Sequence, residues 1–194
     1  MSLIIISILL MIVIGVLYFA NINSIKITQN GVFTNVILIV LSAGFILVDQ
    51  ATKIWAVNTL KTSDIVIWNK VFRLHYLENF GAAYGILNGK KEFLIIFTAI
   101  VTIALIIYMI RIKTDNVFDK VSKFAISMII GGAIGNIIDR MSLGYVRDFL
   151  YFELIDFPVF NVADICVVVG VGLLMLMIII KDIQEEKAKK KQNK

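Results

Sequence analysis

The sequence has few of the side chains on which many enzyme sites depend. Among its 194 residues, only Cys166 is a cysteine and only His75 is a histidine. A single cysteine forms no intramolecular disulfide bond and no cysteine metal cluster, and a single histidine argues against histidine-based triads and most zinc sites. Charged residues make up only 17% of the chain, whereas 59% are hydrophobic. Because soluble proteins carry about a quarter charged residues, we predict an integral membrane protein.

Long uncharged runs predict five transmembrane helices, since about 20 apolar residues cross the hydrocarbon core. The first run has no charge before it and no small-residue cleavage site after it, so we expect a retained helix rather than a cleaved signal peptide. In the fourth run, Gly131 and Gly135 are spaced to let helices approach closely in lipid. Pro158, the only proline, suits the first turn of the fifth helix. The predicted helices cover residues 3–20, 32–57, 93–110, 124–138 and 159–180.

The longest segment between these runs, residues 58–92, is predicted to contain short strands. Residues 65–68 and 71–77 are rich in β-branched and aromatic side chains that partly alternate with polar ones. Lysine and arginine are denser in the segments that are cytoplasmic if the C-terminal tail is inside. This bias predicts an N-terminus outside, a tail inside and segment 58–92 on the outer face.

Aspartates gather where the predicted helices end. Asp139 follows the fourth run, Asp164 lies near the start of the fifth, and Asp148 lies in a loop-like connection between them. Ionisable groups at membrane depth are costly and usually functional. Two close carboxylates cannot both ionise easily, so they could share a proton and activate a water molecule. From spacing alone, Asp139–Arg140 and Asp148–Arg147 could also be simple ion pairs at the membrane surface.

Other functions could use the same carboxylates. A proton-coupled transporter could use Asp49, Asp139 and Asp164 as a relay, and a phosphotransferase could bind Mg²⁺ through Asp139, Asp148 and Asp164. Against the transporter, the polar groups lie at one membrane face and no carboxylate is placed in mid-span. Against the phosphotransferase, the sequence has no D-x-x-D run and no phosphate-binding glycine loop. Asp49 and Lys53, which share a helix face, fit a self-neutralising pair as well as a functional one.

Five short blocks occur in order at the predicted helix ends and in the outer segments. They are Asp49-Gln50-Ala51-Thr52-Lys53, Asn79-Phe80-Gly81-Ala82-Ala83-Tyr84, Gly131-Gly132 with Gly135-Asn136-Ile137-Ile138-Asp139-Arg140, Val146-Arg147-Asp148-Phe149 and Phe160-Asn161-Val162-Ala163-Asp164. Together they resemble the lipoprotein signal peptidase (signal peptidase II) family of membrane aspartic proteases. Two features depart from the family, namely the extra run 3–20 and Tyr84, where phenylalanine is more usual. Neither departure touches the aspartates of the last two blocks.

The resemblance implies an all-α membrane protein with four family helices, one extra N-terminal helix and a small extracytoplasmic β-sheet. The expected parts are residues 1–31 (extra helix and linker), 32–180 (membrane domain with outer segment 58–92) and 181–194 (basic tail). The implied catalytic dyad is Asp148 and Asp164. We expect Arg140 to face this dyad and Arg147 to point elsewhere. The implied supporting residues are Asp49, Lys53, Asn79, Gly81, Asn136, Asp139, Arg140 and Asn161.

The resemblance also implies the reaction and its setting. The enzyme is expected to remove the signal peptide of lipid-modified prolipoproteins by cleaving before the diacylglyceryl cysteine. No cofactor and no metal are implied. The expected partners are the prolipoprotein substrate and membrane lipids, with no obligate protein partner. The net charge of +5 comes mainly from the tail and needs no nucleic acid. The implied location is the bacterial cytoplasmic membrane, with the active site at the extracytoplasmic face.

Overall fold

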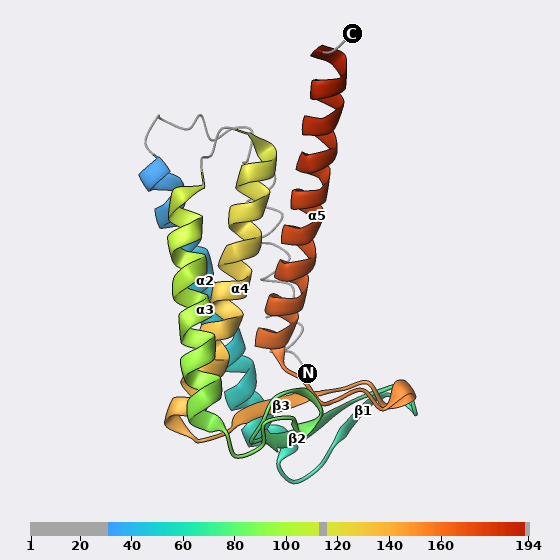
Figure 1. Ribbon diagram of the computed structural model, residues 1–194. Coiled ribbons are helices and arrows are strands. Elements are labelled where there is room, and N and C mark those ends of the chain that lie inside the picture. The colour runs from blue at the N-terminus through green and yellow to red at the C-terminus, as the bar shows by residue number, and fades with distance from the viewer. Residues whose placement is uncertain (1–30, 113–115, 193–194) are drawn as a thin grey trace.

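The computed structural model describes residues 31–112 and 116–192 (Figure 1). The predicted helix at 3–20 lies outside these residues. In the described part, four helices are long and apolar enough to cross a membrane, which confirms the four later runs. They are α2 (Gly31–Leu60), α3 (Lys91–Arg111), α4 (Val117–Ser142) and α5 (Val162–Gln192). The described part of the basic tail continues α5.

The start of α5 differs from the prediction. The helix begins at Val162, and Pro158 lies before it, so the placement of this proline in the first helical turn is wrong. The reason is that Phe160 pairs with Leu150 of a neighbouring strand. Its backbone N–H donates to the carbonyl oxygen of Leu150 at 2.9 Å, which keeps the chain extended as far as residue 160.

α4 is the central helix of the bundle. It packs against α2, α3 and α5, and most of its spanning residues are buried. Glycine makes the contact with α5 possible, because a Cβ at Gly132 would lie 2.3 Å from the carbonyl oxygen of Ala163. At the α2 side, a Cβ at Gly131 would lie 2.7 Å from the Cβ of Phe45. The prediction that small residues allow close helix packing in this run is confirmed.

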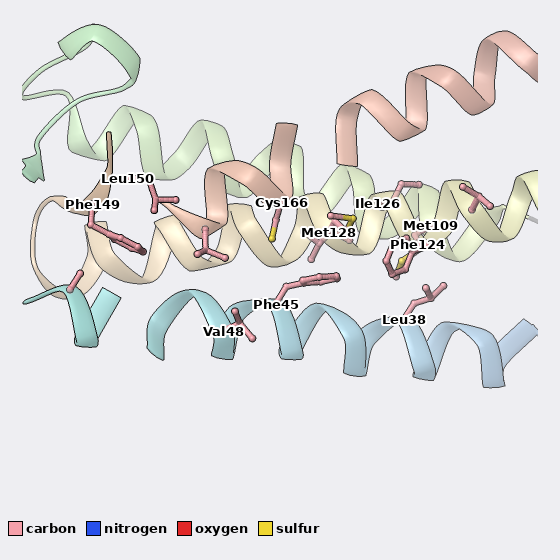
Figure 2. Packing of buried hydrophobic residues seen from close by; sticks show 14 of the residues in the cluster. Leu38, Phe45, Val48, Met109, Phe124, Ile126, Met128, Phe149, Leu150 and Cys166 are labelled. Carbon is pink, nitrogen blue, oxygen red and sulfur yellow. The ribbon is translucent and has the colours of Figure 1, made fainter. Parts of the chain in front are cut away.

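The apolar core follows the line where α2 and α4 meet. Leu38 and Phe45 of α2 point towards Phe124 and Met128 of α4 (Figure 2). The rings of Phe45 and Phe124 meet edge to face, with their centroids 6.1 Å apart. The other faces of α2, α3 and α5 expose many large apolar side chains, as expected for surfaces that face lipid.

A three-stranded antiparallel sheet lies across one end of the bundle (Figure 1). Its strands are β1 (Ile65–Trp68), β2 (Phe72–Asn79) and β3 (Val146–Tyr151), in that spatial order. β1 and β2 confirm the predicted strands, whereas β3 corrects the expectation of a loop around Asp148. α2, α3, α4 and α5 all begin or end at the sheet, so chain segments distant in sequence meet there. Two short 3₁₀ helices complete this region, η1 (Ala83–Gly85) and η2 (Glu153–Ile155).

Candidate active site

Asp148 and Asp164, the predicted dyad, come from different elements and are joined by one residue. Asp148 lies on β3, and Asp164 is the third residue of α5. The side-chain Nδ2 of Asn161 donates to Oδ1 of Asp148 at 2.6 Å. The backbone N–H of Asn161 donates to Oδ2 of Asp164 at 3.0 Å. The structure thus brings both carboxylates to Asn161.

Asn161 also caps the N-terminus of α5, where it forms a reciprocal pair of hydrogen bonds with Asp164. The backbone N–H of Asp164 donates to Oδ1 of Asn161 at 3.0 Å, while Asp164 accepts from the backbone of Asn161 as described above. This is a capping box, in which the N-cap residue and the residue three positions later satisfy each other's backbone donors. The carboxylate of Asp164 therefore lies at the positive end of the helix dipole, where negative charge is stabilised.

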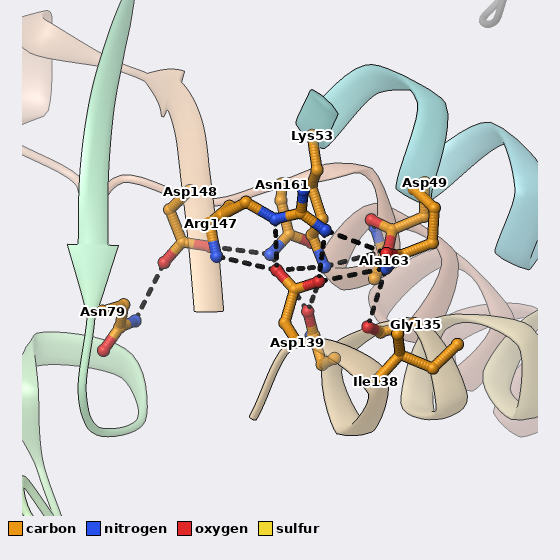
Figure 3. A network of polar contacts seen from close by, with 12 residues as sticks. Asp49, Lys53, Asn79, Gly135, Ile138, Asp139, Arg147, Asp148, Asn161 and Ala163 are labelled. Atoms are coloured by element: carbon orange, nitrogen blue, oxygen red, sulfur yellow. Dashed lines mark hydrogen bonds and ion pairs between the residues drawn. The ribbon is translucent and has the colours of Figure 1, made fainter. Parts of the chain in front are cut away.

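Two further amides complete the contacts of the dyad. Asn79 of β2 donates from Nδ2 to Oδ2 of Asp148 at 2.9 Å (Figure 3). Asn136 of α4 donates from Nδ2 to Oδ1 of Asp164 at 2.8 Å. The orientation of Asn136 is fixed by Lys53, whose Nζ donates to Oδ1 of Asn136 at 2.9 Å. Because an ammonium group can only donate, the amide must turn its oxygen to Lys53 and its NH₂ group to Asp164.

A buried network of charges lies beside Asp148 (Figure 3). Lys53 contacts Oδ2 of Asp49 at 2.9 Å and Oδ2 of Asp139 at 3.6 Å. Asp139 also accepts two bonds from the guanidinium group of Arg147, at 2.7 and 3.0 Å. Asp49 in turn accepts from the backbone N–H of Ala163 in the first turn of α5, at 3.0 Å. Two carboxylates and two cations thus balance one another and connect α2, α4, β3 and α5.

The dyad lies at the polar end of a largely apolar cavity of about 600 Å³. The cavity opens between α3 and α5, with Ile129 and Ala133 of α4 between them. Its polar end also includes Arg140, which donates from Nη2 to the carbonyl oxygen of Gly81 at 3.0 Å and so fastens the loop after β2. The apolar walls include Phe97, Val101 and Leu105 of α3 and Val168 of α5.

Comparisons with known proteins agree on one family. A family model described as Signal peptidase (SPase) II matches residues 41–180. A lipoprotein signal peptidase from Clostridium acetobutylicum is 44% identical over 149 residues, which cover 75% of this chain and 94% of the relative. One from Clostridium tetani is 42% identical over 156 residues, covering 78% and 96%. The chain belongs to the signal peptidase II family.

Solved structures extend the likeness to the fold. A bacterial membrane enzyme structure determined by the in meso method at 2.3 Å resolution is 34% identical, with a TM-score of 0.63. The match covers 78% of this chain and 90% of the solved one. As a member of this family, the protein is a membrane aspartic peptidase, which is a hydrolase, and it has several helices that could span a membrane. This membership does not favour the transporter alternative.

The carboxyl group of Asp148 has a pKa unlike that of an ordinary aspartate. Burial first, and then the nearby charge of Asp164, raise the pKa of Asp148, whereas hydrogen bonds from Asn79 and Asn161 lower it, and the result is a pKa of about 7. A carboxyl group with this pKa retains a proton in part of the molecules at neutral pH. Asp148 is therefore suited to donate a hydrogen bond or a proton.

The structure places the predicted site residues together, and Arg147 points away from the dyad, as expected. Its side chain is buried against Asp139, and Nη2 also donates to Oε1 of Gln50 at 2.9 Å. Asp139 thus pairs with Arg147 and not with Arg140, and Asp148 pairs with amides. The sequence did not indicate that Asp139 is the partner of Arg147. The direction of Arg147 follows from strand alternation, because neighbouring residues of β3 point to opposite faces. Arg147 then points to α2 and α4 when Asp148 points to α5.

Proposed function

We propose that this protein removes the signal peptide from lipid-modified prolipoproteins by cleaving the peptide bond before the diacylglyceryl cysteine. The observation that supports this most directly is the placement of Asp148 and Asp164 at the polar end of an apolar cavity. The names of the relatives support the same substrate class, because they are lipoprotein signal peptidases. We place the reaction at the extracytoplasmic face of the bacterial cytoplasmic membrane, where the sheet and the dyad lie in the predicted topology.

In the proposed mechanism, the two aspartates have different roles. The carboxylate of Asp164 removes a proton from a water molecule, which attacks the carbonyl carbon of the scissile bond. The protonated carboxyl group of Asp148 donates a hydrogen bond to the carbonyl oxygen, where negative charge develops. The C–N bond then breaks, and the proton taken from water passes to the leaving amine nitrogen. Because the two groups are coupled, their protons are lost in steps that belong to the pair.

The cavity supports a substrate with an apolar part next to the reacting bond. The walls from α3 and α5 offer contacts to acyl chains and to the hydrophobic signal segment. Each buried CH₂ group contributes about 0.8 kcal/mol, so the lipid supplies binding energy that an unmodified chain lacks. Asn79 and Asn136 keep the carboxylates in place, and Arg140 is close enough to line the same cavity.

The direct test incubates the purified protein in detergent with a lipid-modified prolipoprotein and follows the product by mass spectrometry. The expected product begins with the diacylglyceryl cysteine, and EDTA should leave its formation unchanged. The same prolipoprotein without the lipid is the matched control. Equal cleavage of the two substrates, or a cut at another position, would contradict the proposal.

A further inference from the structure

The tip of the β1–β2 hairpin carries a row of exposed and half-buried aromatic side chains on one face. Trp68 of β1 pairs with Phe72 of β2, and the ring of Phe72 lies 5.4 Å from that of Phe152, just after β3. Trp68 is 69% exposed, and Phe152 is exposed as well. In Figure 1 this end of the sheet reaches sideways beyond the base of α5. Trp68, Phe72 and Phe152 are called the aromatic row below.

The aromatic row continues a face that is buried under the helices. Leu74 and Leu150 are cross-strand partners, both are buried, and each lies two residues from a member of the row. Residues two apart on a strand share a face, so Asp148 lies on this face too. Since Asp148 contacts Asn161 at the base of α5, the face looks towards the side from which the helices extend.

The opposite face of the tip is mostly polar, although it also carries the exposed side chain of Val66. Arg73 pairs with Tyr151 across the sheet, and its guanidinium carbon lies 5.8 Å from the centre of that ring. Arg73 also forms an ion pair with Glu153. On the same face, Nδ1 of His75 lies 2.9 Å from Oδ1 of Asp64. The tip is thus amphipathic, with aromatic side chains on the side of the helices and charged side chains on the other.

The aromatic row lies near the level at which the lipid-facing surface of α5 begins. Val171, which does not line the cavity, is nine residues into α5, about 14 Å along its axis, and is 41% exposed. Leu154 and Ile155 of η2 add to the exposed apolar surface of the tip, at 65% and 67% exposure. The backbone N–H of Leu154 donates to the carbonyl oxygen of Val71, which holds η2 against the hairpin. Tryptophan and tyrosine are enriched at this depth, at the membrane–water interface, and Trp68 fits this preference.

We propose that the aromatic row, together with Leu154 and Ile155, docks into the headgroup region of the bilayer beside α5. The partner of this surface is therefore a lipid surface, and the polar face with Arg73 remains in water. The apolar surface is continuous with the lipid-facing side of the bundle, and this continuity selects lipid as the occupant. The contact also helps to position the site, because it holds the sheet that carries Asp148 against the membrane that α5 spans.

The test compares two single-cysteine variants, Trp68→Cys and Val66→Cys, in a Cys166→Ala background. Val66 is the matched control, because it is exposed on the same strand but pairs with Arg73 on the polar face. Each variant is labelled with the fluorophore NBD and reconstituted into phosphatidylcholine–phosphatidylglycerol vesicles. At position 68 we expect blue-shifted emission, strong quenching by doxyl-labelled lipid and protection from iodide. At position 66 we expect quenching by iodide and little by the lipid.

Similar iodide quenching at both positions, with no effect of doxyl lipid, would overturn the proposal. Protection at position 68 that disappears when the protein is diluted in lipid would also overturn it, because a second copy of the chain would then cover the surface. A second measurement leaves Trp68 in place. In a Trp55→Phe variant, the remaining tryptophan should be quenched by brominated lipids, and quenching by iodide alone would count against lipid contact.

Discussion

At the scale of single residues, the site depends on which groups can carry a proton. Asn161, Asn79 and Asn136 donate hydrogen bonds to the two aspartates, and an amide neither gains nor loses a proton at ordinary pH. Asp148 and Asp164 are thus the groups of this cluster that can exchange protons with water and substrate. Their neighbours hold them without competing for the proton.

The first prediction replaces each aspartate with its amide. Asp148→Asn and Asp164→Asn should each abolish turnover without unfolding the protein, because asparagine has nearly the same shape but cannot transfer the proton. The double variant should be little worse than either single one, since members of a catalytic unit are not additive. Cleavage rates in detergent are measured on samples with matched thermal stability. Asp156→Asn, an exposed aspartate near the sheet, is the control, and near-normal cleavage by either dyad variant would refute the mechanism.

The second prediction concerns pH. The pKa of Asp148 rises from its usual 3.8 to about 7 in the folded protein, so the folded state prefers the protonated form. This preference stabilises the fold at low pH, and the stabilisation is lost as the pH rises to 7. The wild type should therefore lose thermal stability between about pH 4 and pH 7 relative to Asp148→Asn. Melting curves of both proteins in one detergent give the comparison, and parallel curves would show that burial does not perturb this carboxyl group.

The cleavage rate should also depend on the protonation of Asp148. If Asp148 acts as the acid, the rate should fall as the pH rises above about 7, because the proton it must donate is lost. The rate of the wild type measured with lipid-modified prolipoprotein should thus decrease on the alkaline side of neutrality. A rate that keeps rising up to pH 9 would assign the acid role to another group.

At the scale of elements, the start of α5 serves both helix formation and the site. Asn161→Ser should keep the N-cap, since serine is a good N-cap residue, but should remove the Nδ2 donor to Asp148. We expect thermal stability near that of the wild type and a strong loss of cleavage. Asn161→Ala should lose the cap as well, at a cost of about 1 kcal/mol. If the serine variant cleaves normally, the bond from Asn161 to Asp148 has no role in positioning the dyad.

Arg147 links β3 to the helices through its ion pair with Asp139. We therefore expect its loss to destabilise the protein more than the loss of Arg73. Arg147→Ala leaves the buried carboxylate of Asp139 short of a partner, and breaking a buried ion pair costs about 3–5 kcal/mol. Arg73 pairs with Glu153 at the surface of the same sheet, where an ion pair contributes about 0–1 kcal/mol. Thermal unfolding in detergent should therefore show a large loss for Arg147→Ala and a small one for Arg73→Ala. Equal losses would argue against the buried network as a source of stability.

The sequence predicted those helices and strands whose signal lies within their own residues. α3 could be predicted because its 18 central residues carry no charge, and β1 and β2 because β-branched and aromatic residues cluster there. β3 could not, because Arg147 and Asp148 interrupt its apolar residues and because its partner, β2, is distant in the sequence. The bond between Arg147 and Asp139 was missed for the same reason, since it depends on which face of β3 each side chain occupies.

At the scale of the whole molecule, the described contacts of the site fall between Asp49 and Asp164, and they involve residues of α2, β2, α4, β3 and α5. The family resemblance named the dyad and its supporting residues, but the structure supplied their connections, such as the link from Lys53 through Asn136 to Asp164. The division of the chain into residues 1–31, 32–180 and 181–194 stays a prediction, as does the topology with the N-terminus outside.

The last prediction concerns the first predicted helix, which lies outside the described residues. Deletion of residues 1–24 should leave cleavage largely intact, because the proposed dyad, its amides and its charged network all come from residue 49 onwards. The shortened protein is purified in detergent and assayed with lipid-modified prolipoprotein, and the same deletion carrying Asp164→Asn provides the inactive control. In the predicted topology, the start of α2 is on the cytoplasmic side, as is the tail. The deletion should leave this unchanged, so the dyad keeps its outer position. A shortened protein that inserts and folds but does not cleave would assign the first helix to the active site.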